Sequence, residues 1–185
     1  MPPKQKLNKD AIVATALSLV RQQGADALNA RELAKSLGTS TQPIFTHFAS
    51  MSEVKRAVIA AAWERYLAMR AEDMESGRYP PYKASGMSYI RFAGEEKELF
   101  RLLFMRDRSK EELMANEADD MAAFVADMLS FSLDTARRFH LMMWIYVHGI
   151  ATMIATHYLT FSEDAASALL SEAFLGLKNQ YHKED

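Results

Sequence analysis

The sequence predicts an all-α protein, and three features of its composition and patterning support this fold class. Only seven of the 185 residues are glycine and five are proline, whereas the helix formers Ala, Leu, Met and Glu are abundant. Apolar residues make up 49% of the chain, which is enough to build a buried core. In most segments they recur every three or four residues, as on one face of a helix. We therefore expect about nine helices, with a three-helix head in residues 1–50 and a helical body in residues 51–185.

The first residues predict a basic arm followed by a helix. The arm carries Lys4 and Lys6, which are placed either to touch phosphate groups or to lie in a solvated tail. Asn8 is a good helix cap, and Gly24 is a good helix end. The apolar stripe between them is formed by Ile12, Val13, Ala16, Leu17 and Val20. We expect this first helix to end at Gln23.

The stretch Asn29–Ser50 predicts two short helices joined by a tight turn. Its first residue can cap a helix, and Glu32 can complete a capping box. Gly38 can end that helix, because a left-handed terminal residue costs glycine little. Ser40 then caps a second helix, which we expect to span Thr41–Phe48.

The second of these helices is expected to have one apolar and one polar face. We expect Ile44, Phe45 and Phe48 to face the preceding helix. The side chains left outside are Thr41, Gln42, Thr46 and His47. Such a face suits DNA, because Gln can bond adenine bidentately and Thr offers a hydroxyl and a methyl group. The alternative is an ordinary helical hairpin with a solvated face.

The pattern Arg31-Glu32-Leu33-Ala34, followed by Gly38 and then Ile44-Phe45-Thr46-His47-Phe48, resembles the N-terminal domain of the tetracycline-repressor (TetR) family. The resemblance covers roughly residues 8 to 60. It implies a helix-turn-helix domain that binds DNA. The candidate DNA contacts are Lys6, Arg31, Ser40, Thr41, Gln42, Thr46 and His47.

Two positions depart from the family pattern. Family members usually carry Tyr where this chain has Phe45, and Lys where it has Met51, and both family residues typically hold DNA phosphates. Two backbone contacts are therefore weakened or missing. We expect His47 and the nearby lysines to supply more of the phosphate binding.

Beyond residue 50, caps and apolar periodicity predict six more helices. Their expected spans are Met51–Ser76, Tyr82–Gly94, Glu95–Met105, Ala118–Phe131, Thr135–His157 and Ser162–Tyr181. The expected caps are Ser50 with Glu53, Asp134 and Ser162. The helix that begins near residue 135 is apolar almost all round, so we expect it to be buried on more than one side.

The body is rich in aromatic and methionine side chains, with twelve methionines in all, which favours an adaptable apolar pocket as well as a core. The candidate pocket residues are Trp63, Tyr66, Phe100, Phe104, Phe124, Met128, Trp144 and His148. The spacing Trp144-x-x-x-His148-Gly149 resembles the Trp-His-Gly signature of one C-terminal domain type in the TetR family, whose region is taken to bind effectors. His148 could instead be a core histidine whose ring nitrogens are hydrogen-bonded within the protein.

The distribution of charge favours DNA binding by one end of the chain. The net charge of −2 argues against indiscriminate nucleic-acid binding. Residues 1–55 nevertheless carry +3, whereas residues 56–185 carry −5. A basic head on an acidic body is typical of a protein that meets DNA through its head alone.

Several other classes are disfavoured. The chain has no cysteine, which excludes disulfides and thiolate metal sites, and no catalytic, metal-binding or phosphate-cradling motif indicates an enzyme or a cofactor. The acidic cluster Glu95, Glu96 and Glu98 is explained by a helix start, where the dipole favours carboxylates. Without an 18-residue apolar run or the core of a signal peptide, we expect a cytoplasmic protein that does not enter membranes.

The sequence thus predicts a homodimeric transcriptional regulator, in first place a repressor, that binds a palindromic operator and is released by a small, largely apolar effector. The candidate dimer seam is formed by Ala151, Ala155, Ala166, Leu169, Ala173 and Gly176. Two alternatives remain open. The body could dock another protein and take no ligand, or the chain could be a helical binding module whose head is structural.

Overall fold

The computed structural model describes residues 7–107 and 115–181, and in these residues it contains nine α-helices, one 3₁₀ helix and no strand. The all-α prediction is confirmed. The chain divides into two compact units, one formed by residues 1–71 and 95–106 and the other by residues 72–94 and 107–185. Within the described residues, none of the helices combines the length and hydropathy that a membrane span requires.

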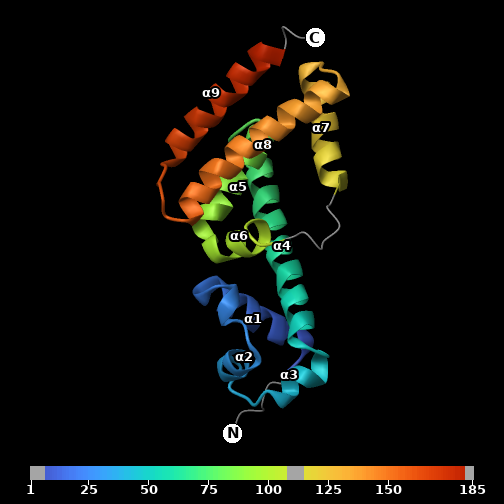
Figure 1. The fold of residues 1–185 in the computed structure, drawn as a ribbon, viewed down its shortest axis with the longest axis vertical. Coiled ribbons are helices and arrows are strands. Elements are labelled where there is room, and N and C mark those ends of the chain that lie inside the picture. Colours follow the sequence, from blue (N-terminus) through green and yellow to red (C-terminus); the bar gives the residue numbers. More distant parts are fainter. Residues whose placement is uncertain (1–6, 108–114, 182–185) are drawn as a thin grey trace. The chain divides into compact units, whose positions relative to one another are not determined.

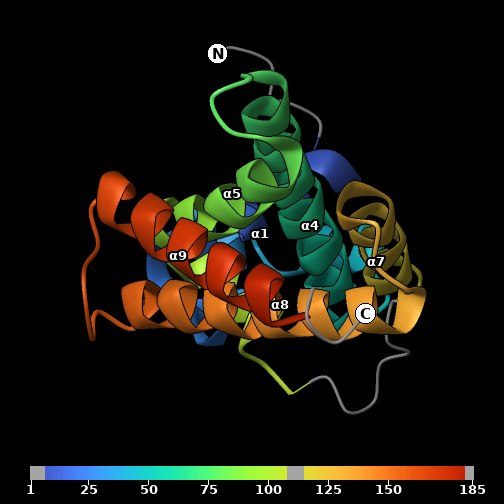
Figure 2. The same ribbon diagram turned by 90° about the horizontal axis from the view of Figure 1, so that it is seen from above.

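Figures 1 and 2 show the helices of the two units. The first unit contains α1 (Lys9–Gln23), η1 (Ala25–Ala27), α2 (Ala30–Ser36), α3 (Gln42–His47), most of α4 (Met51–Glu75) and α6 (Lys97–Phe104). The second unit contains the end of α4, then α5 (Pro81–Glu95), α7 (Ala115–Leu129), α8 (Leu133–Ala155) and α9 (Glu163–Tyr181). The expected boundary between a head of residues 1–50 and a body of residues 51–185 falls inside the first unit, so this division stays a prediction.

Asparagine caps begin the first two helices, as predicted. The side-chain oxygen of Asn8 accepts the amide hydrogen three residues on at 2.8 Å and so begins α1. Asn29 begins α2 by accepting the amide hydrogens of Arg31 and Glu32 at 3.1 and 3.0 Å. The expected capping box is not completed, because the N–H of Asn29 already donates to the carbonyl of Ala27.

A glycine ends α2 in the predicted way. Gly38 has a φ of 64°, and its N–H donates to the carbonyl of Lys35, while the next N–H, of Thr39, donates back to Ala34. This is a Schellman arrangement, which satisfies the last carbonyls of the helix. A Cβ atom on Gly38 would meet nothing within 4 Å, so the requirement for glycine is conformational.

The next helix is shorter than predicted. The proposed cap at Ser40 is wrong, because α3 begins at Gln42 and the residue before it, Thr41, has helical backbone angles and makes no side-chain cap bond. A capping side chain needs an extended backbone to reach the free N–H groups. At the other end Phe48 is already extended, with φ −132° and ψ 131°. The helix is thus limited to six residues.

A capping pair begins α4. The hydroxyl of Ser50 accepts the N–H of Glu53 at 3.3 Å, and the Glu53 carboxylate accepts the N–H of Ala49 at 2.8 Å. Figure 1 shows α1, α2 and α3 grouped beside the first half of this helix. Their shared core is made of fully buried side chains, among them Ile12, Ala16, Val20, Leu33, Ile44, Val54 and Val58.

Close helix contacts build the second unit. There α8 packs against both α7 and α9. A Cβ atom on Gly86 of α5 would lie 3.4 Å from Val147 of α8 and 3.4 Å from Leu170 of α9, so this glycine permits a close approach of three helices. The predicted cap of α8 at Asp134 is wrong, since Ser132 caps a helix that begins at Leu133, two residues earlier than predicted.

Hydrogen bonds from tyrosine to histidine join α5 to α8. The Tyr82 hydroxyl lies 3.0 Å from His140 Nδ1, and the Tyr89 hydroxyl lies 2.8 Å from His148 Nδ1. Burial raises the pKa of Tyr82, so this phenol stays neutral over the ordinary pH range. Two tyrosine–histidine hydrogen bonds therefore link the two helices.

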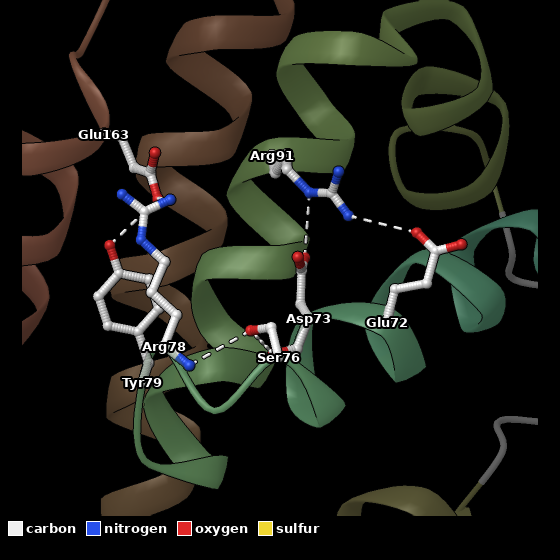
Figure 3. A network of polar contacts seen from close by, with 7 residues as sticks. All are labelled: Glu72, Asp73, Ser76, Arg78, Tyr79, Arg91 and Glu163. Atoms are coloured by element: carbon white, nitrogen blue, oxygen red, sulfur yellow. Dashed lines mark hydrogen bonds and ion pairs between the residues drawn. The ribbon is translucent and has the colours of Figure 1, made fainter.

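A surface network ties the α4–α5 connection to its neighbours, as Figure 3 shows. The Arg78 guanidinium lies 2.6 Å from the Glu163 carboxylate at the start of α9, and the Tyr79 hydroxyl donates to the same carboxylate at 3.1 Å. Arg91 of α5 donates to Asp73 in the last turn of α4 at 3.1 Å. The end of α4 is thereby fixed within the second unit.

Candidate nucleic-acid interface

Two buried side chains orient α3. Ile44 and Phe48 lie four residues apart, and both are almost completely inaccessible to solvent. The remaining large or polar side chains of this segment are exposed: Thr41, Gln42, Phe45, Thr46 and His47. The four polar residues among these were predicted to lie on the outside, and in the structure all four are exposed. Their contact with DNA stays a prediction.

Phe45 does not face inward, as the sequence had suggested, and this prediction is wrong. Its side chain is 46% exposed. In a helix each residue is rotated by about 100° from the one before it, so Ile44 and Phe45 cannot both point at one neighbour. Because Ile44 and Phe48 occupy the inward direction, Phe45 lies on the outward face beside Gln42.

The outward face carries less hydrogen-bonding capacity than its composition suggests. The Thr46 hydroxyl donates to the carbonyl of Gln42 at 3.2 Å. Its hydrogen is thereby used within the helix, so a base could use only the hydroxyl oxygen or the methyl group. The side-chain amide of Gln42 thus stands beside two mainly apolar groups, those of Phe45 and Thr46.

His47 anchors the segment that precedes α1. Its Nε2 atom lies 3.0 Å from the carbonyl oxygen of Leu7, and because a carbonyl only accepts, Nε2 is the donor. The predicted contact residue Lys6 precedes this anchor directly but lies outside the described residues. Arg31 and Ser40, the other two candidates, are exposed.

Charged groups at the start of α4 are arranged around Glu53. Lys9 lies 3.5 Å from this carboxylate and 4.9 Å above the Phe48 ring. The N–H of Ala49 is the main cause that lowers the pKa of Glu53, and Lys9 adds to it. One turn after Met51, the exposed Lys55 shares its side of the helix. A lysine side chain leans toward the helix N-terminus, so Lys55 extends toward position 51, and a phosphate contact by it stays a prediction.

A buried carboxylate joins three helices of the first unit. Glu96, at the start of α6, is 5% exposed. It accepts two hydrogen bonds from Arg21 of α1 at 2.6 and 2.7 Å and one from Arg65 of α4 at 2.6 Å. Burial alone raises the pKa of Glu96, but the bonds and charges of the two arginines outweigh it and hold that pKa below its usual range.

We call Arg21, Arg65 and Glu96 the arginine–glutamate lock. The prediction that Glu96 merely answers the helix dipole is wrong, because its partners are two arginines on other helices. The lock fixes the beginning of α6 to α1, one of the three helices of the head.

Family models match the chain at both ends. Residues 12–58 match the model of bacterial regulatory proteins of the tetR family, and residues 82–174 match the tetracyclin repressor-like C-terminal domain. The second match alone spans half of the chain. The chain belongs to the TetR family. It is a DNA-binding transcriptional regulator and not an enzyme.

Individual proteins agree with this assignment. An uncharacterized HTH-type transcriptional regulator of Mycobacterium tuberculosis is 25% identical over 170 residues, covering 82% of this chain and 72% of the relative. A TetR-like transcriptional regulator from Rhodococcus sp. RHA1 has a TM-score of 0.69 at 16% identity, covering 94% of this chain and 97% of that one. The multidrug binding protein EbrR, complexed with imidazole, has a TM-score of 0.58 at 18% identity, covering 88% and 92%. At such identities the two structures show a shared fold alone.

Half of the predicted pocket residues of this TetR-family regulator cluster in its first unit. The Trp63 ring centre lies 5.2 Å from that of Phe104 and 5.8 Å from that of Tyr66, both edge to face. Phe100 lies 5.2 Å from Phe104. Rings at these distances attract one another, so these four residues join α4 to α6. We call them the aromatic cluster.

The other predicted pocket residues belong to the second unit. Trp144 and His148 lie one turn apart on α8, with their rings stacked 5.0 Å apart. His148 is bonded to Tyr89, and burial lowers its pKa. Phe124 and Met128 share one exposed face of α7. A ligand contact for any of these side chains stays a prediction.

The residues predicted for the dimer seam fall into two groups. Ala151, Ala155 and Ala166 are buried in the core of their own chain. Leu169 and Ala173 are half-buried on α9, and Gly176 is exposed. The three alanines therefore serve close packing within one chain, and a dimer contact through the second group stays a prediction.

Sequence reasoning missed an apolar stripe on α8. Leu141, Met142 and Ile145 are all about half exposed. The prediction that this helix is buried on more than one side is confirmed, because α8 packs against α5, α7 and α9, but this stripe is left uncovered. The all-round apolar character of α8 is the signal in the sequence that could have indicated this stripe.

Proposed function

We propose that this regulator is a ligand-responsive repressor that binds a palindromic operator as a homodimer and is released by a small, largely apolar effector. The outward face of α3 is the observation that carries the proposal. Buried Ile44 and Phe48 hold the helix in place while Gln42 and its neighbours stay exposed. In a helix-turn-helix domain this is the face that enters the major groove.

Two heads are needed for useful specificity. A helix of six residues reaches only a few base pairs, so one head alone selects a short sequence. The exposed stripe on α8, formed by Leu141, Met142 and Ile145, supports a second subunit as its partner, together with Leu169 and Ala173 of α9. Two copies related by a twofold axis would read an inverted repeat.

The aromatic cluster supports a route from effector to head. A ligand that separates Phe104 from Trp63 and Tyr66 would move α6 along α4. The arginine–glutamate lock holds the other end of α6 to Arg21 of α1, so this movement would reach the head. A tilt of both heads would remove the spacing of about 34–36 Å that successive major grooves require.

Selection of bound duplexes from a random library by the full chain tests the DNA half of the proposal. The expected result is an inverted repeat whose half-site centres lie about 10–10.5 base pairs, or a multiple of this, apart. The variant Leu169→Asp should keep its helices by circular dichroism but lose the dimer and the operator. Enrichment of an unsymmetrical site, or a dimer that survives this change, would contradict the proposed assembly.

Linked binding measurements test the effector half. Thermal-shift screening of apolar and cationic aromatic compounds supplies a binder, and its affinity is then measured with and without operator. The operator should weaken ligand binding by the same factor by which the ligand weakens operator binding, corresponding to about 1–3 kcal/mol. A ligand that stabilises the protein and leaves operator affinity unchanged would contradict release by the effector.

A further inference from the structure

Phe45 is an exposed aromatic ring in the middle of the face that the proposed function assigns to DNA. It follows Thr41 by four residues and Gln42 by three, so all three side chains share one side of α3. The ring is 46% exposed although the adjacent Ile44 is fully buried. An apolar ring in this position gains free energy when an apolar surface covers it.

We infer that Phe45 is a specificity-determining residue that reads a thymine through its 5-methyl group, beside the base that Gln42 reads. The inference rests on the proposed reading of DNA by α3. Thymine is the base that presents a methyl group in the major groove, and phenylalanine is suited to contact it. The side chain offers no hydrogen bond, so shape and apolar contact are its means of discrimination.

The spacing on the helix supports a pair of neighbouring readers. Residues 42 and 45 are separated by about 4.5 Å along the helix axis, close to the rise of about 3.4 Å between base pairs. Gln42 carries the amide that suits adenine, and Thr46 adds a methyl group on its other side. The three side chains therefore favour a half-site with adjacent A·T pairs.

A position against the phosphates fits this side chain less well. The tyrosine that family members usually carry at this position typically holds a DNA phosphate, whereas Phe45 has no hydroxyl group. A bare ring against a phosphate would displace water without replacing its hydrogen bonds, which costs free energy. Contact with a thymine methyl displaces water from two apolar surfaces instead.

Removing single methyl groups from the DNA tests the inference. Full-length protein is first used to select its operator, and each thymine of that operator is then replaced by deoxyuridine, which keeps the base pair and lacks the methyl group. A single replacement should weaken binding about fourfold, and one replacement in each of the two half-sites about fifteenfold. The variant Phe45→Ala should bind the original operator more weakly and show no difference between thymine and deoxyuridine there, whereas Phe45→Leu should keep part of the difference.

Other results would overturn the inference. Wild-type protein that tolerates deoxyuridine at every position, or a Phe45→Ala variant with the same methyl dependence as the wild type, would show that the ring does not read thymine. An equal gain in affinity for all duplexes on Phe45→Tyr, with no methyl effect, would place the residue on the phosphates. A selected operator without methyl dependence overturns this inference alone, whereas failure to select any duplex overturns the proposed function as well.

Discussion

The two units of this regulator fix their helices with different chemistry. In the first unit, a carboxylate buried at Glu96 takes hydrogen bonds from Arg21 and Arg65, so that three helices meet at one ionic junction. In the second unit, α5 is joined to α8 by two tyrosine–histidine hydrogen bonds, Tyr82 to His140 and Tyr89 to His148, and its ion pairs of Arg78 with Glu163 and Arg91 with Asp73 lie at the surface.

The difference bears on how each unit responds to change. A buried charge that loses its partners is costly, so the ionic junction tolerates few alternatives in its geometry. A neutral bond can be lost or rearranged for about 1 kcal/mol. The geometry of the first unit at this junction is therefore the more costly of the two to change.

The largest effect is expected from Glu96→Ala, which leaves two arginines without their common partner. We expect a loss of about 2–4 kcal/mol in the free energy of unfolding, less than for a completely buried pair because both arginines are partly exposed. Urea unfolding followed by circular dichroism measures it. The neighbouring Glu95, which is exposed, is the matched control, and Glu95→Ala should change stability by less than about 1 kcal/mol, the range of an interaction at the surface. Equal losses for both variants would show that the junction does not hold the first unit.

The two junctions should also lose stability in different pH ranges. The pKa of Glu96 is lower in the folded chain, so its contribution is complete above about pH 4.3 and is lost as the pH falls further. The pKa of His148 is lowered by burial, so the unfolded chain takes up its proton first and stability falls as the pH drops below about 6.5.

Variants separate these two contributions. The free energy of unfolding is measured between pH 3 and 8. Its slope against pH should become smaller near pH 4 in Glu96→Gln and smaller near pH 6 in His148→Asn. Each slope is at most about 1.4 kcal/mol per pH unit for one proton. A Glu96→Gln variant that instead flattens the profile near pH 6 would reverse the assignment.

A smaller change is expected from Tyr89→Phe, which removes one neutral hydrogen bond and keeps the ring. The His148 side chain is half-buried, so we expect a loss of about 1 kcal/mol in unfolding free energy. Tyr79→Phe, which removes a hydroxyl at the surface, is the control and should cost less. A loss as large as that of Glu96→Ala would remove the contrast between the two units.

The smallest effect on stability is expected from Met51→Lys, at a partly exposed position of the first unit. Its readout is operator affinity as a function of salt. One added phosphate contact in each subunit of the proposed dimer should steepen the log–log slope by about two units. Lys55→Met should make the slope shallower by a similar amount if Lys55 already serves as the substitute. An unchanged slope in both variants would place this turn of α4 away from the phosphates.

Local signals explain what could be predicted from the sequence. Side-chain caps at Asn8, Asn29 and Ser50, and the glycine end at Gly38, were predicted correctly because each depends on residues within four positions. The outward direction of Phe45 was missed, since in a helix of fewer than two turns the choice of inward residues depends on the neighbouring helices.

Long-range partners explain what could not be predicted. Glu96 lies 75 residues from Arg21 and 31 from Arg65, so no spacing along the chain indicates that they meet. The exposed stripe on α8 was missed for a related reason. Its residues are as apolar as those that α8 buries in the core, so only the packing of the neighbouring helices shows which side is left uncovered.

The lock also has a consequence for how this gene can change over time. Because one carboxylate serves two arginines, mutation of codon 96 alone removes all three hydrogen bonds, whereas mutation of one arginine codon leaves the bonding of the other arginine in place. Divergence should therefore proceed through loss of one arginine first. Homologues without Glu96 are then expected to lack both arginines. The residues at positions 21, 65 and 96 should therefore covary.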